Sequence, residues 1–188
     1  MTLLRFDQVA CLRGGRLLFE GLSFALEPGS ALLVTGPNGC GKSSLMRVAA
    51  GLLPAAAGRV QSSAAALADD SLALDRELPL RRALLFWAKL DDGEGRLDAA
   101  MGDFGLAHLA EVPVRMLSTG QARRARLARV AAAGAPLWLL DEPLNGLDAA
   151  GGELLGTAIA RHRQGGGAVL AASHLDLPGG PWQRLELA

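Results

Sequence analysis

The chain has 188 residues, of which 50% are hydrophobic, and its 19 basic and 19 acidic residues give a formal net charge of zero. This length allows one sizeable core with a small subdomain, but hardly a second domain of ordinary size. The balanced charge argues against binding of nucleic acid by bulk electrostatics. The two cysteines, Cys11 and Cys40, are too few for a disulfide framework or a zinc cluster.

The first part of the chain contains short, partly alternating apolar segments at residues 3–9, 17–19 and 22–27, separated by glycine-containing turns. Alternation of this kind, broken by glycine, is typical of antiparallel strands. We therefore expect a small antiparallel sheet of short strands ahead of the main fold.

A glycine-rich loop follows an apolar run at residues 31–35, and this run predicts a buried strand. The loop fits the P-loop pattern G-x-x-x-x-G-K-[ST], and Ser44 follows it; its residues are Gly36, Pro37, Asn38, Gly39, Cys40, Gly41, Lys42 and Ser43. In this pattern backbone N–H groups cradle phosphates, the lysine neutralises them and the hydroxyl binds Mg²⁺. Residues 43–53 predict a helix whose N-terminus points at the anion. We expect a nucleoside triphosphate site with Ser43 as a metal ligand.

Residues 55–75 have little periodicity and predict only a strand near residues 58–60. Residues 80–90 have one apolar face at helical spacing, and residues 97–109 form a second helical stretch interrupted by glycine. Together these stretches predict a small helical subdomain at about residues 71–133.

Ser118 or Thr119 can cap a helix over residues 122–133, in which Leu127 and Val130 are expected to face inward. Four arginines lie on the same helix: Arg123, Arg124, Arg126 and Arg129. A hydroxyl together with the free N–H groups of a first helical turn makes an anion site. Ser118 alone would more often be a plain cap, and an arginine run alone is most often a solvated face. Because the chain also carries a phosphate loop, the hydroxyl and the arginines together favour a second helix N-terminus that binds phosphate.

An apolar run at residues 136–140 ends in Asp141-Glu142-Pro143, as expected where a buried parallel strand delivers acids to its carboxyl end. There Asp141 can hold Mg²⁺ through water, and Glu142 can accept a proton from an attacking water. Two carboxylates in this position could instead be a simple strand cap. The phosphate loop upstream makes that the minority interpretation.

Residues 149–163 predict a helix and residues 168–172 another buried strand, which is followed by His174. An isolated histidine is more often structural than catalytic. At the carboxyl end of a strand parallel to the phosphate-loop strand, however, His174 would face the nucleotide, and we expect a γ-phosphate contact. His108 and His162 are expected on the surface or on a helix.

These segments together resemble the ATP-binding subunits of ABC transporters over nearly the whole chain. The resemblance is carried, in the family's order and spacing, by GPNGCGKS at 36–43, LSTGQ at 117–121, LWLLDEP at 137–143, Leu147-Asp148 and Ser173-His174. It implies an α/β P-loop fold with a parallel core sheet, an N-terminal antiparallel β subdomain and a small α-helical subdomain. All of these would belong to a single nucleotide-binding domain over residues 1–188. The implied activity is ATP hydrolysis, with Glu142 polarising water.

The LSTGQ element separates this family from other P-loop enzymes. Its resemblance implies a head-to-tail homodimer that forms on ATP binding, in which Ser118 and Gly120 of one copy complete the phosphate site of the other. Gln121 and Asp148 are carried over from the family's motifs as further nucleotide-binding residues. Hydrolysis would separate the pair and drive a membrane partner.

Within the family, the short chain and residues 19–24, 85–87 and 112–118 look like the branch that serves cytochrome c maturation. That branch implies integral membrane subunits in a bacterial inner membrane, a peripheral position on its cytoplasmic face, and ATP-driven heme export or release of a heme chaperone. The sequence agrees, because its apolar stretches are too short to span a bilayer and its N-terminus lacks a secretory leader.

Two features depart from the family pattern. The loop that leads into the helical subdomain carries Asp69 or Asp70 where the family has a glutamine, or in this branch sometimes a histidine. An acid beside the γ-phosphate could slow hydrolysis. The first glycine turn has no aromatic neighbour that could stack on adenine, so the base contact is either weak or made by an arginine face, that of Arg13 or Arg16.

Other functions remain open at this point. One is the ATPase of another small ABC transporter, and a second is a soluble ABC-type ATPase that acts on nucleic acid or ribosomes, motivated by the arginines after LSTGQ. Such soluble proteins usually carry two fused nucleotide domains or a long insertion, and the zero net charge predicts no nucleic acid partner. A P-loop kinase or GTPase has no reason to carry LSTGQ and an Asp-Glu pair in this register.

Overall fold

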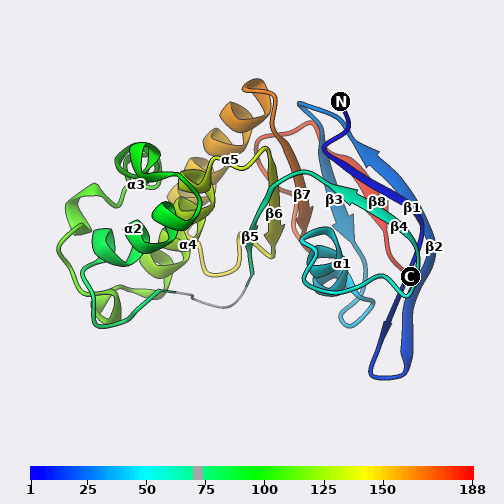
Figure 1. Ribbon diagram of the computed structural model, residues 1–188. Helices are drawn as coiled ribbons and strands as arrows, with labels where there is room; N and C mark the ends of the chain where they lie inside the picture. Colours follow the sequence, from blue (N-terminus) through cyan, green and yellow to red (C-terminus); the bar gives the residue numbers. More distant parts are fainter. Residues whose placement is uncertain (70–73) are drawn as a thin grey trace.

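The computed structural model describes residues 1–69 and 74–188, which form two β-sheets and several helices (Figure 1). Asp70, one of the two acids expected in the loop before the helical subdomain, lies outside the described residues. The strands are β1 (Leu4–Arg13), β2 (Arg16–Leu26), β3 (Ala31–Thr35), β4 (Ala57–Ser62), β5 (Ala65–Ala68), β6 (Leu137–Asp141), β7 (Ala168–Ala172) and β8 (Gln183–Glu186). The α-helices are α1 (Lys42–Ala49), α2 (Leu80–Leu90), α3 (Leu97–Asp103), α4 (Thr119–Ala133) and α5 (Ala149–Gln164).

A parallel sheet in the order β5-β6-β7-β3-β8 forms the centre of the molecule. Its strands contribute side chains to two hydrophobic cores, because successive side chains of a strand point to opposite faces of the sheet. Leu32 and Val34 pack with side chains of α1 and of the antiparallel sheet, whereas Leu33 packs in the cluster that contains α5. The sheet is therefore covered on both faces, and the expected parallel core sheet is confirmed.

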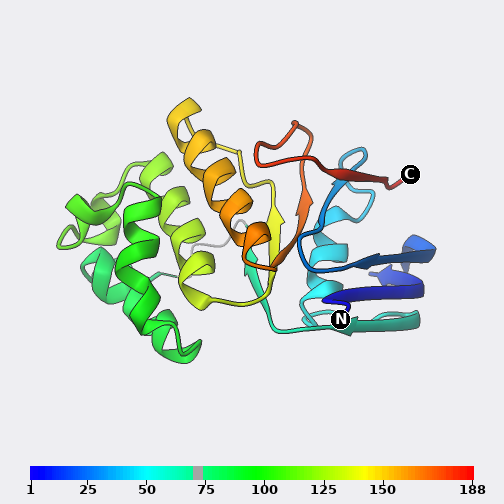
Figure 2. The ribbon, with the colours of Figure 1, turned by 90° about the horizontal axis from the view of Figure 1, so that it is seen from above.

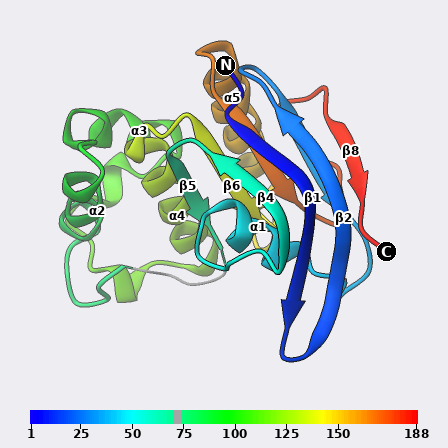
Figure 3. The same ribbon diagram turned by 45° about the vertical axis from the view of Figure 1, so that its right-hand side comes forward.

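The second sheet is antiparallel, in the order β2-β1-β4, and its β1–β2 hairpin extends well past β4 (Figure 3). The prediction of separate strands at residues 17–19 and 22–27 is wrong, because both segments belong to β2. Gln8 (φ 51°) and Gly21 (φ 64°) lie where the β1–β2 register shifts. A bulge of this kind bends a strand without ending it.

The helical lobe consists of α2, α3, α4 and the short 3-10 turns η1 (Glu94–Arg96), η2 (Ala107–Leu109) and η3 (Val114–Met116). It lies to one side of the parallel sheet, with α5 between them (Figure 2). The helix predicted at residues 80–90 is confirmed, and the stretch at 97–109 divides into α3 and η2. Leu127 and Val130 are buried, as expected. The bounds 71–133 for the helical subdomain, and its place in a single domain over 1–188, stay predictions.

Two further elements differ from their predictions. The helix after the phosphate loop ends at Ala49, earlier than the expected 53. The edge strand β5 was not predicted at all, because its alanine-rich sequence has no apolar alternation. In the part of the chain that the structure describes, no helix is long and apolar enough to cross a membrane.

Candidate functional site

The phosphate loop connects the end of β3 to the start of α1, in the predicted strand-loop-helix order. Gly36 has a φ of 142°, and a Cβ there would collide with the carbonyl of Leu187 and lie 2.9 Å from Cys40 Sγ. Gly41 has a φ of 112°, and a Cβ there would lie 3.1 Å from Cβ of Leu18. These two glycines therefore allow β8 and the β1–β2 hairpin to close directly on the loop.

Lys42 is the first residue of α1 and is only 8% exposed. Its Nζ donates to the carbonyl oxygens of Gly36 at 2.8 Å and Pro37 at 3.1 Å. These bonds satisfy a charge that would be costly to bury alone. They also hold the ammonium group at the N-terminal end of a helix, where an anion is favoured.

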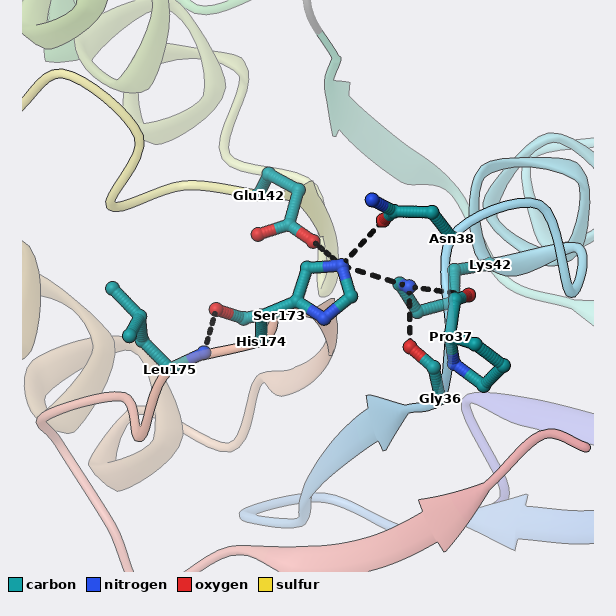
Figure 4. Close-up of polar contacts among 8 residues, drawn as sticks. All are labelled: Gly36, Pro37, Asn38, Lys42, Glu142, Ser173, His174 and Leu175. Atoms are coloured by element: carbon teal, nitrogen blue, oxygen red, sulfur yellow. Dashed lines mark hydrogen bonds and ion pairs between the residues drawn. The ribbon is translucent and has the colours of Figure 1, made fainter.

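His174 follows β7, and its Nε2 is the atom where three other groups converge (Figure 4). Nε2 lies 2.8 Å from Oδ1 of Asn38, 3.1 Å from Nζ of Lys42 and 3.5 Å from Oε1 of Glu142. A ring with its hydrogen on Nε2 donates to Asn38 or Glu142, whereas the other neutral tautomer accepts from Lys42. The structure thus brings His174 to the phosphate loop, and its contact with a γ-phosphate stays a prediction.

Asp141 ends β6, and Glu142 follows it with a φ of 46°, in the left-handed region. A non-glycine residue is uncommon in that region. The Glu142 N–H donates to the carbonyl of Ala172 at 2.8 Å, which ties this turn to the end of β7. Because His174 lies two residues after the end of β7, the same bond sets the two side chains beside each other.

A cavity of about 320 Å³ joins these groups. Among the described residues, its lining consists of Arg13, Leu18, Asn38, Gly39, Gly41, Lys42, Ser43, Ser44, Asp141 and Glu142. A lysine, a loop hydroxyl and two acids therefore line one space at the carboxyl ends of parallel strands, and their roles in binding and catalysis stay predictions. Leu18 was not predicted here, because its position depends on how the hairpin packs against Gly41.

The LSTGQ element lies at the start of α4 and does not line this cavity. Ser118 Oγ accepts from the Gln121 N–H at 3.2 Å, and Gln121 Oε1 accepts from the Ser118 N–H at 2.8 Å, which makes a capping box. Asp148 caps α5 by accepting from the Gly151 N–H at 2.8 Å. Within one chain, then, Ser118, Gly120, Gln121 and Asp148 do not meet the phosphate loop, and their binding roles stay predictions.

The arginines of α4 are half-buried, so they do not form the solvated face that an arginine run alone would most often be. Arg124 donates to the carbonyl of Phe104 at 3.1 Å, and Arg129 to the carbonyl of Leu67 at 2.5 Å. Arg126 donates to the carbonyl of Asp69, which directly follows β5. Burial also lowers the pKa of Arg129. Arg126 and Arg129 therefore join α4 to the sheet at β5, whereas Arg124 joins α4 to the end of α3.

Comparisons with known proteins agree with this geometry. A family model described as ABC transporter matches residues 19–145. The chain is 61% identical to the cytochrome c biogenesis ATP-binding export protein CcmA of Sphingopyxis alaskensis, over 94% of this chain and 92% of that protein. It is 51% identical to the protein of the same name from Zymomonas mobilis, over 95% of this chain and 81% of that protein.

Solved structures share the fold at lower sequence identity. An ATP-binding subunit of an ABC transporter aligns with a TM-score of 0.83 at 22% identity, covering 93% of this chain and 80% of that chain. A dimeric ATP-binding cassette, described as a post-hydrolysis state bound to ADP and Pi, aligns with a TM-score of 0.81 at 18% identity, covering 92% and 88%. The expected ATPase fold is therefore confirmed.

Proposed function

Because the chain belongs to the ABC transporter family and, within it, to the cytochrome c biogenesis ATP-binding export proteins, we propose that it is the ATP-hydrolysing subunit of such a transporter. Its partners would be integral subunits in a bacterial inner membrane, and the transport step would be heme export or release of a heme chaperone. The observation that carries the proposal is the single cavity shared by Lys42, Ser43, Asp141 and Glu142.

ATP would bind with its phosphates on the loop and on the first turn of α1, where free backbone N–H groups favour an anion. Lys42 would neutralise phosphate charge from its position on the loop carbonyls. The Ser43 hydroxyl and the Asp141 carboxylate fit Mg²⁺, because both are oxygen donors and both line the cavity. When held there, Mg²⁺ would offset the charge of the phosphates.

Glu142 would take a proton from the water that attacks the γ-phosphorus, while the bond to the departing ADP oxygen breaks. His174 would hold a γ-phosphate oxygen, and its 3.5 Å approach to Glu142 would keep the base aimed at the same point. Asn38, 2.8 Å from the ring, would orient the imidazole. These roles rest on the way in which the order of the strands brings the three side chains together.

A second copy of the chain would complete the site. Because Ser118 Oγ already accepts a hydrogen bond from the Gln121 N–H, its own hydrogen is left to be donated to a phosphate oxygen. Gly120, which carries no side chain, would let the partner's phosphates approach the helix start. We assign Gln121 and Asp148 to the same contact, so that ATP would join two chains head to tail.

The membrane subunit would dock in a groove of about 800 Å³ between the helical lobe and β5. Leu52 and Leu90 line this groove and are 69% and 64% exposed, and Phe86, one turn from Leu90 on α2, is 57% exposed. Asp91 and Asp92 also line it, together with Arg96 and Arg129, whose guanidinium groups donate to backbone carbonyl oxygens. Cytoplasmic loops of membrane proteins are rich in Lys and Arg, so a basic, partly apolar segment of that subunit fits both the acids and the leucines.

The first test is Glu142→Gln, which keeps the shape of the side chain and removes the base. We expect ATP affinity to be retained and phosphate release to fall by at least about 100-fold. Glu153→Gln on the exposed side of α5 is the matched control and should hydrolyse ATP normally. Normal turnover of the Glu142 variant would remove that residue as the base, and a native chain that binds no ATP would refute the function itself.

A further inference from the structure

The imidazole of His174 is held at only one of its two ring nitrogens (Figure 4). Its three polar neighbours, Asn38, Lys42 and Glu142, all approach Nε2, and Nδ1 has no hydrogen-bond partner among the described residues. The side chain is also 46% exposed, so packing contributes little to its orientation. A histidine that must present one nitrogen to a ligand is ordinarily fixed through a hydrogen bond at the other. The direction of this ring therefore depends on the backbone from which it projects.

Ser173, the residue between β7 and His174, fixes that backbone on one side. It is 1% exposed, and its N–H donates to the carbonyl of Val34 at 3.2 Å. This bond continues the pairing of β7 with β3 by one residue beyond the last strand pair, Val34 with Ala172. The carbonyl of Ala172 in turn accepts from the Glu142 N–H. The turn that carries His174 thus starts from a point that is bonded both to the phosphate-loop strand and to the proposed base.

The Ser173 side chain fixes the same backbone on the other side. Its Oγ accepts a hydrogen bond from the Leu175 N–H at 3.0 Å, two residues further along the chain (Figure 4). A serine oxygen bonded in this way closes a tight turn around the residue between the two partners. Here the enclosed residue is His174. Leu175 itself is 59% exposed, so its side chain does little to hold the turn.

We propose that Ser173 is a positioning residue for ATP hydrolysis, because its hydroxyl closes the turn that directs Nε2 of His174 toward the γ-phosphate. Ser173 does not itself line the phosphate cavity, so its effect on the reaction passes through His174. A displacement of about 1 Å in an active site can slow a reaction by about 100-fold while the substrate still binds. This inference rests on the proposed function.

The kinetic test uses Ser173→Ala, which removes the accepting oxygen and adds no bulk. We expect kcat for phosphate release to fall by about 10-fold to 100-fold, with the KM for ATP within about 3-fold of native. Affinity for ADP, which lacks the γ-phosphate, should be unchanged by calorimetry. Ser63→Ala is the matched control and should hydrolyse ATP normally. The Ser63 hydroxyl also bonds to a backbone group, the Leu3 carbonyl at 3.0 Å, but it lies outside the phosphate cavity.

Two further measurements separate the aim of the ring from packing. The chain has three histidines, so the ring signal of His174 in a proton NMR spectrum can be assigned by its loss in His174→Ala. In the absence of nucleotide, Ser173→Ala should shift that signal and leave those of His108 and His162 in place. Ser173→Thr retains the accepting oxygen and should recover most of the native kcat, although it adds a methyl group at a buried position.

An unchanged His174 signal or a normal kcat in Ser173→Ala would overturn the proposal. Loss of ADP binding in that variant, or an equal loss of kcat in Ser173→Thr, would show that Ser173 acts through packing of the site and would overturn it as well. A native chain that hydrolyses no ATP, yet shows the selective shift of the His174 signal, would refute the proposed function and leave the hold of Ser173 on the ring intact.

Discussion

At the scale of single residues, the site is organised by strand order. β7 lies between β6 and β3 in the sheet, so the residue that follows β7 must lie between the acid after β6 and the loop after β3. His174 occupies that position and reaches both Glu142 and Lys42. Its contact with Asn38 joins positions 136 apart in sequence. The cluster is therefore a property of the sheet rather than of any one loop.

The types of these residues could be predicted from the sequence, but their contacts could not. Apolar runs that end in acids or histidine predict parallel strands with polar carboxyl ends, and this interpretation placed Asp141, Glu142 and His174 at one edge. The order of the strands depends on long-range pairing, which no local pattern encodes. For the same reason the sequence named Arg13 as one of two base-contact alternatives and missed Leu18.

His162 offers a prediction about acid stability. Its ring stacks on Trp138 with centroids 4.1 Å apart, and burial lowers the pKa of His162 below its ordinary value. The His162 imidazole is neutral in both the folded and the unfolded chain above about pH 6.5. Below that pH the imidazole takes up a proton in the unfolded chain before it does so in the folded one. Its contribution therefore makes the free energy of unfolding fall with acidification, by at most about 1.4 kcal/mol per pH unit.

His162→Gln cannot take up this proton, so its urea midpoint should change less than that of the native chain between pH 7 and pH 5. The matched control is His108→Gln on the exposed η2 turn, which should follow the native profile. An unchanged acid slope in His162→Gln would show that other groups govern acid unfolding.

At the scale of elements, α4 connects two functions. Its N-terminus carries the capping box of Ser118 and Gln121, and its arginines anchor the helical lobe to β5. The same helix thus presents a proposed phosphate contact at one end and fixes the lobe along its length. A change at Ser118 can act on helix stability or on the second copy of the chain, and the two effects can be separated.

Ser118→Ala removes the cap and should lower the free energy of unfolding by about 1 kcal/mol. Ser118→Asp keeps a capping oxygen, so the stability of the single chain should remain close to native. Because Glu142→Gln should bind ATP without hydrolysing it, we expect that variant to hold the ATP-bound dimer closed. The negative charge of Ser118→Asp would oppose the partner's phosphates, so this dimer should not form in the double variant. Size-exclusion chromatography with ATP detects the dimer, and thermal unfolding measures the stability of the single chain. A stable dimer of the double variant would show that Ser118 does not face a phosphate.

Elements with strong periodicity could be predicted almost to their ends, as the strands β3 and β7 and the helix α2 show. The failures have physical causes. β5 is held by its pairing with β6 rather than by its own alanine-rich sequence, and β2 continues through Gly21 because a bulge absorbs the extra residue. In both cases the pairing with a neighbouring strand overrode the local signal.

At the scale of the whole molecule, the parallel sheet separates the antiparallel sheet from the helical lobe (Figure 2). The proposed docking groove lies between that lobe and β5, on the far side of the sheet order from β3. A partner seated there would contact both the lobe and the sheet edge. A rotation of the helical lobe would then be transmitted to the membrane subunit through this groove.

Leu90→Glu should therefore weaken membrane association when the transporter's membrane subunits are co-expressed, because it places a charge in the apolar part of the groove. ATP hydrolysis by the isolated chain should not change, since Leu90 is outside the phosphate cavity. The matched control is Leu17→Glu, an exposed leucine on the β1–β2 hairpin. Fractionation of membranes measures the difference, and equal recovery of all three chains with the membrane would exclude the groove as the docking site.

The position of β3 also constrains when the protein can become active during its synthesis. Both neighbours of β3, the strands β7 and β8, come from residues 168–186, and the carbonyl of Leu187 closes on the loop at Gly36. A growing chain on the ribosome makes the phosphate loop before the two strands that support it. Until β7 and β8 have been synthesised, the apolar strand β3 lacks both of its neighbours, so we expect the phosphate loop to bind nucleotide only after these two strands have paired with β3.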